Sequence, residues 1–139
     1  MGNSVAPQML AYPAVPPSGG ELYETSAALG GTTVITLQVT NEGRAKVGLC
    51  RIKIKRVSGA AANFTPYIFS KSGVTTAGDI SQEYAGAATA VGTLFDPAEP
   101  QSAPVPMMTD ANGRLYLMIG PDAGADNVFY YMLRFFVYR

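Results

Sequence analysis

The stretch from Val128 to Tyr138 is apolar at nearly every position, with Arg134 as its one charged residue. Successive side chains of a strand point to opposite faces of its sheet. One face would then carry Phe129, Tyr131, Leu133, Phe135 and Val137, and the other Val128, Tyr130, Met132, Phe136 and Tyr138. A small antiparallel domain usually covers one sheet face and leaves the other to water. This strand therefore predicts burial on both sides, the second side against the chain's own second layer or a second subunit.

Alternating and turn-forming residues predict an all-β chain. Residues 32–40 alternate apolar and polar side chains, and Asn41-Glu-Gly43 would join them to residues 45–57 as a hairpin. Asp110-Ala-Asn-Gly113 predicts a type I′ hairpin between residues 105–109 and 114–119. Pro66 places the strand at 64–69 at an edge or a bulge, and the prolines of residues 96–106 indicate an extended connector.

These elements predict a jelly-roll-like antiparallel β-sandwich. At 139 residues the chain has the length of one domain. We assign residues 21–139 to this single β-sandwich domain and residues 1–20 to an extended, Pro-rich N-terminal arm. The arm interleaves its prolines with apolar side chains, which a solvated linker would lack. The arm residues predicted to dock are Val5, Met9, Leu10 and Tyr12.

The composition removes several classes of function. The chain has no histidine, which excludes Ser-His-Asp and Cys-His catalysis and every metal site that needs an imidazole. Ten basic and ten acidic residues cancel, so neither nucleic acid nor a membrane surface is an expected direct partner. No apolar run reaches the roughly 20 residues of a spanning helix. The N-terminus lacks the pattern of a secretory signal.

Cys50 alternates with Ile52 and Ile54, so we interpret it as a small buried hydrophobe of the core face rather than a nucleophile. Carboxylates in turns could serve a glycosidase, and the candidates are Asp96, Glu99, Asp110, Asp122 and Asp126. Asp122 with Asp126 could instead bind calcium, but Asp is also an ordinary turn residue. We therefore expect no enzyme activity, no catalytic residue, no metal and no cofactor.

Basic residues cluster in the strand that follows residue 44. Arg51, Lys53 and Lys55 share the face opposite Ile52 and Ile54. Such a face is usually solvated, and tracking of single-stranded nucleic acid is the less favoured interpretation. A third interpretation is an electrostatic contact in which this basic face of one subunit meets an acidic surface of another.

The arm from Gly2 to Pro17, the β-core from Thr32 onward and the terminal strand together resemble the small head-decoration, or cementing, proteins of tailed bacteriophages, in particular those of jelly-roll type. The likeness spans the chain but rests on architecture and not on a motif. It implies a structural virion protein made in the host cytoplasm, which binds the outer capsid surface and holds neighbouring major capsid protein subunits together. A homo-oligomer, dimer or trimer, would suit that role.

In this interpretation the arm residues contact the capsid, and the outward face of the terminal strand makes the oligomer or second-layer contact. The residues assigned to the latter are Tyr130, Met132, Phe136 and Tyr138. The alternative is a receptor- or carbohydrate-binding module of a phage tail or fibre, because jelly rolls also build lectins. Tyr84, Tyr116 and Asp122 could then line a glycan site.

Overall fold

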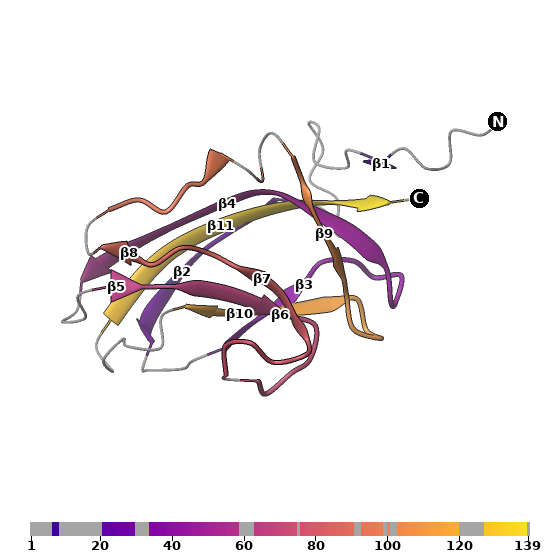
Figure 1. Ribbon diagram of the computed structural model, residues 1–139, viewed down its shortest axis with the longest axis horizontal. Helices are drawn as coiled ribbons and strands as arrows, with labels where there is room; N and C mark the ends of the chain where they lie inside the picture. Colours follow the sequence, from indigo (N-terminus) through magenta and orange to yellow (C-terminus); the bar gives the residue numbers. More distant parts are fainter. Residues whose placement is uncertain are drawn as a thin grey trace.

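The structure is a computed structural model. It describes residues 7–8, 21–29, 34–58, 63–74, 76–90, 93–98, 100, 103–119 and 127–138. These residues form two main antiparallel β-sheets that pack face to face, together with one short two-stranded sheet (Figure 1).

The first sheet is built around β11 (Asn127–Tyr138). β4 (Lys46–Ser58) pairs with one edge of β11 along most of its length. β2 (Glu21–Leu29) and β1 (Pro7–Gln8) share the opposite edge. β9 (Val105–Met108) pairs with the far side of β4. β11 is thus flanked by other strands on both edges.

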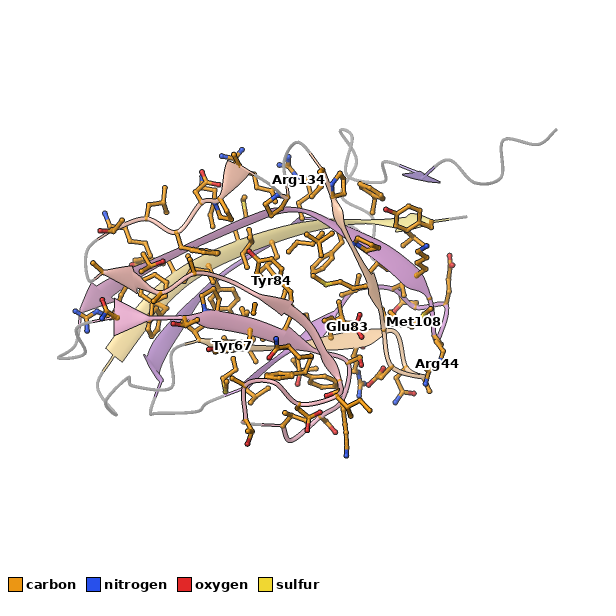
Figure 2. The ribbon with its side chains drawn as sticks, viewed as in Figure 1. Arg44, Tyr67, Glu83, Tyr84, Met108 and Arg134 are labelled. Carbon is orange, nitrogen blue, oxygen red and sulfur yellow. The ribbon has the colours of Figure 1, made fainter. Side chains whose placement is uncertain are left out.

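The second sheet has the order β3-β10-β6-β7, and β5 and β8 form a separate short pair. Their bounds are β3 Val34–Gln38, β10 Arg114–Ile119, β6 Pro66–Phe69, β7 Gln82–Ala85, β5 Asn63–Phe64 and β8 Thr89–Ala90. A hydrogen bond from the backbone N–H of Met108 in β9 to Glu83 Oε1 of β7, 3.1 Å long, links the two sheets on one side (Figure 2).

The strand order identifies the fold. Along the chain β2, β4, β9 and β11 belong to the first sheet, and β3, β6, β7 and β10 belong to the second. The first sheet is ordered β2-β11-β4-β9 and the second β3-β10-β6-β7, so the chain crosses repeatedly from one sheet to the other. Eight antiparallel strands connected in this way form a jelly roll of two Greek keys. The predicted fold class is confirmed.

Both predicted hairpins are wrong in their pairing. β3 pairs with β10 and β4 pairs with β11, so the turn after residue 40 is a corner between sheets. The turn at 110–113 likewise leads from β9 in the first sheet to β10 in the second. It is not type I′, which needs two residues with positive φ, because no described residue other than glycine has a positive φ and here only Gly113 does, at 75°.

The core lies between the sheets, and the inward face of β11 is central to it. Phe129, Leu133 and Phe135 are completely buried, and Tyr131 and Val137 nearly so. The Phe129 ring meets that of Phe64 edge to face, with centroids 5.4 Å apart. The predicted core face of the terminal strand is therefore confirmed.

Pro66 begins β6, which lies between β10 and β7. The predicted edge position is wrong, because the first residue of a strand also tolerates proline. The alternative, a bulge, is borne out, since the pairing of β6 with β7 shifts register between Ile68 and Phe69. Its carbonyl still accepts a 2.8 Å hydrogen bond from the N–H of Gly86.

A β-bulge places Cys50 differently from the prediction. Arg134 is in register with Arg51, but the next residue, Phe135, is in register with Leu49, so Cys50 is the extra residue of β4. Cys50 is buried as predicted. Leu49 takes the core position that strict alternation would give to Cys50. The Cys50 thiol donates a 3.4 Å hydrogen bond to the carbonyl of Arg134.

Asp110 organises the corner between β9 and β10. Its Oδ1 accepts hydrogen bonds from the backbone N–H groups of Asn112 (2.8 Å) and Arg114 (2.9 Å), and its Oδ2 accepts one from the Tyr116 hydroxyl. Desolvation acts to raise the pKa of Asp110, but the hydrogen bond from Tyr116 and those from the backbone outweigh it and hold the pKa below 3.8. Desolvation and the same carboxylate raise the pKa of the Tyr116 hydroxyl, which keeps it a donor.

Asp110→Asn is expected to lower the free energy of unfolding by about 1–2 kcal/mol near neutral pH, because an amide accepts these hydrogen bonds more weakly than a carboxylate. A carboxyl whose pKa is lower in the folded than in the unfolded state stabilises the fold above its unfolded pKa, and this contribution disappears as the pH falls through the folded pKa. Denaturant melts from pH 7 to pH 2 should show the two proteins converging below about pH 4. A constant difference over that range would contradict the assignment.

Candidate interaction surface

The outer face of the first sheet carries a shallow apolar hollow next to lysines. On adjacent strands, Lys53 is in register with Met132 and Lys55 with Tyr130. Tyr130 is 41% exposed, and Met132 and Lys53 are partly buried. The hollow has a volume of about 250 Å³ and is lined by Lys53, Lys55, Leu94, Tyr130, Tyr131 and Met132.

The segment before β9 forms one wall of this hollow. Phe95 is buried and forms a bridge to Ile54 of β4, with N–O distances of 2.8 and 3.0 Å. This bridge fixes the neighbouring Leu94, which stays 47% exposed at the surface. This segment therefore adds to the sheet edge and also presents an apolar side chain beside the basic face. Farther along, Ala98 and Pro100 are helical, so the prediction of an extended connector over residues 96–106 is wrong at these positions.

The four residues predicted for the oligomer or second-layer contact have different environments. Tyr130 and Met132 line the hollow, whereas Phe136 is buried, with 2% of its surface exposed. The Phe136 ring lies over Gly48, where an added Cβ would come within 2.8 Å of it, and meets the Tyr138 ring edge to face at 5.3 Å. The ammonium of Lys46 covers Tyr138 at 5.2 Å. Neighbouring side chains thus cover one end of this face and leave the other end open.

The basic residues also separate into different environments. Arg51 forms a 3.2 Å ion pair with Asp96 of the connector. Lys53 and Lys55 have no ion pair with the described residues. Arg56 is 5% exposed, because its register with Phe129 turns it toward the interior. Arg134 is partly buried on the outer side of the first sheet (Figure 2). The exposed positive charge of the basic face therefore comes mainly from Lys53 and Lys55.

Sequence reasoning did not predict the exposure of Ile80, Leu94 and Met108. Ile80, in the loop between β6 and β7, is fully exposed. The available signal was its position among turn-forming residues, Gly78-Asp79-Ile80-Ser81, where no strand or helix would bury an apolar side chain.

The tyrosines proposed for a glycan site are covered. Tyr116 is buried and its hydroxyl is bonded to Asp110. Tyr84 is half-buried and packs against the main core (Figure 2). Neither ring presents an open face of the kind that stacks on a sugar, and Asp122 lies outside the described residues.

The remaining candidates do not converge on a site. Asp96 pairs with Arg51, and Asp110 is part of a turn. Within the described ranges, no three His, Cys, Asp or Glu residues group in a way that could hold a metal ion. Glu99, Asp126 and the arm residues Val5, Met9, Leu10 and Tyr12 lie outside the described residues, so their roles stay predictions.

The described part of the chain includes no helix with the length and hydropathy needed to cross a membrane.

No protein-family model matches the chain, and no curated protein is similar to it in sequence. Among solved structures, the chain is similar to a chain of the "Structure of infectious bursal disease virus Gx strain", with 10% sequence identity and a TM-score of 0.40. The match covers 88% of this chain and 32% of the viral chain, so this chain spans about a third of that chain's length. A likeness this distant assigns neither a family nor a function.

Proposed function

We propose that the chain is a structural virion protein that binds the outer surface of a phage capsid and cements neighbouring capsid subunits. The observation that carries this proposal is the strand order β2-β11-β4-β9 over β3-β10-β6-β7, combined with an outer face that stays open at Tyr130 and Met132. Viral capsid proteins are among the main users of the jelly roll. An open apolar hollow in a charged surround suits a protein that works within an assembly.

The proposed mechanism is multivalent attachment. The arm, through Val5, Met9, Leu10 and Tyr12, contacts the major capsid protein, while the open end of the outer face contacts another subunit. Each contact adds effective concentration to the others, so individually modest contacts give stable attachment. Lys53 and Lys55 would orient the subunits by facing acidic surfaces, which influences orientation and association rate more than affinity. Arg51, predicted to act with them, is already paired with Asp96 of its own chain.

A variant with Val5, Met9, Leu10 and Tyr12 changed to Ser is expected to bind capsids at least about tenfold more weakly, because each substitution removes buried apolar surface. The measurement is cosedimentation of the purified protein with empty capsids of the virus that encodes it. The native protein should saturate at a fixed number of copies per capsid. These substitutions leave the backbone pairing of β1 with β11 available, whereas deleting residues 2–17 would remove it.

The matched control changes four other arm residues, Asn3, Ala6, Ala11 and Ala14, to Ser. It keeps the arm's length and prolines and should bind as the native protein does. Equal binding by the apolar-depleted and control arms, with both proteins folded by circular dichroism, would exclude the arm contact. Failure of the native protein to bind capsids at all would exclude the cementing role.

A further inference from the structure

The loop between β6 and β7 presents Ile80 from a well-defined backbone. Ser81 donates two hydrogen bonds to Asp79 Oδ1, from its N–H at 2.8 Å and from its hydroxyl at 2.7 Å. The N–H of Gln82 bonds to the carbonyl of Asp79 at 2.8 Å, and Gln82 Oε1 accepts a 2.6 Å bond from the N–H of Gly78. A single exposed apolar residue is common on protein surfaces. One held on a hydrogen-bonded turn is preorganised for binding, because little conformational entropy remains to be lost.

The loop also carries a negative charge next to the isoleucine. Hydrogen bonds from the Ser81 N–H and hydroxyl are the main cause of a lowered pKa at Asp79, and the cation of Lys71 in the same loop lowers it further. A surface complementary to this loop would have an apolar recess for the isoleucine and cations next to it for the carboxylate.

The hollow on the outer face of the first sheet has this character. Its volume of about 250 Å³ exceeds that of the roughly 150 Å³ cavity that binds benzene, so it has room for the four-carbon side chain of isoleucine. Leu94, Tyr130 and Met132 supply apolar walls, and Lys53 and Lys55 supply positive charge. The recess and the tip are thus complementary in both size and charge.

We propose that Ile80 of one copy of this chain inserts into the hollow of a second copy, with Asp79 facing Lys53 and Lys55. The β6–β7 loop extends from the lower side of the molecule in Figure 1, whereas β4 and β11 form its upper layer. Tip and hollow therefore belong to different sides of the sandwich, and a contact between them is head to tail. Repeated contacts of this kind close into a ring or continue as a chain.

One such contact buries little surface and belongs to the weak, transient class. It becomes effective where copies are already held side by side, because attachment raises their effective concentration. The inference deepens the proposed function by naming the contact between neighbouring copies on a capsid. It is testable in solution without capsids, so its failure is distinguishable from failure of the cementing role.

The direct test is disulfide trapping between two differently tagged proteins, both carrying Cys50→Ser. One protein carries Ile80→Cys and the other Leu94→Cys. Mixed under oxidising conditions, they should form the mixed dimer at least about tenfold faster than Ile80→Cys forms a dimer with a control protein carrying Asn41→Cys, an exposed position outside both the loop and the hollow. A rate no higher than that of the Asn41 pair, or preferential dimerisation of Ile80→Cys with itself, would overturn the proposal.

A second measurement avoids cysteine chemistry. Sedimentation velocity at rising protein concentration and low salt should show self-association that Ile80→Asp weakens about ten- to a hundredfold. Lys53→Glu should weaken it as well. Ser72→Asp, an exposed change in the same loop, tests whether added charge alone has this effect and should leave self-association close to native. Native protein that stays monomeric to about 1 mM, or an Ile80→Asp protein that associates as the native one does, would contradict the contact.

Discussion

Gly113→Ala is expected to destabilise the fold by about 3 kcal/mol or more. Gly113 has a φ of 75°, a conformation that costs a non-glycine residue about 1–2 kcal/mol. Its surroundings add a steric cost, because an added Cβ would lie 2.1 Å from the carbonyl oxygen of Thr40. That oxygen belongs to backbone fixed by the hydrogen bonds that Val39 and Thr40 donate to the Gly113 carbonyl, at 3.0 and 3.1 Å. Neither side of the clash can move freely.

Gly73→Ala is the matched control. Gly73 has a φ of 78°, nearly that of Gly113, but an added Cβ there would meet no atom within 4 Å. The control should therefore lose only the conformational part, about 1–2 kcal/mol. Urea denaturation of both variants measures the difference directly. Equal losses would mean that Gly113 does not approach Thr40 as closely as the structure shows.

Phe129→Ala is expected to lower the free energy of unfolding by about 3–5 kcal/mol, whereas Tyr130→Ala should lower it by less than about 1 kcal/mol. These neighbours point to opposite faces of β11. Phe129 is fully buried against Phe64, while Tyr130 is 41% exposed at the hollow. Removing the phenylalanine leaves a cavity in the core, and removing the tyrosine leaves none.

Chemical denaturation of both variants under the same conditions checks this pair. A loss of several kcal/mol for Tyr130→Ala would mean that the outer face is covered by the chain's own second layer. Since the proposed subunit contact needs this face open, that result would argue against it.

The terminal strand was predictable because its signal is local. Alternation alone assigns Phe129, Leu133 and Phe135 to one face, and the structure confirms that assignment. Alternation could not show that Phe136 is covered and Tyr130 is open. That difference depends on Gly48, which leaves room for the Phe136 ring, and on the segment that carries Leu94, both distant in sequence from β11.

Turn signals predicted where the chain bends but not which strands then pair. Asn41-Glu-Gly43 and Asp110-Ala-Asn-Gly113 are both bends in the structure, yet each leads from one sheet to the other. Hairpins and corners between sheets use the same residues, because both need glycine and short polar side chains. The pairing of β3 with β10 and of β4 with β11 depends on long-range packing that a local pattern does not contain.

The surface elements of the candidate site were only partly predictable. The lysines at positions 53 and 55 follow from alternation with Ile52 and Ile54. The same alternation puts Arg56 on the face of Ile52 and Ile54, and its register with Phe129 turns it inward. The position of Ile80 among turn-forming residues indicates exposure, but the direction in which the folded loop extends is not contained in the local sequence.

Cryogenic electron microscopy of the virus particle, with and without this protein, tests the central claim most directly. The account predicts one added β-sandwich density per binding site on the outside of the capsid, bridging neighbouring major capsid subunits. Density at the tail, inside the shell or at no fixed position on the particle would contradict it.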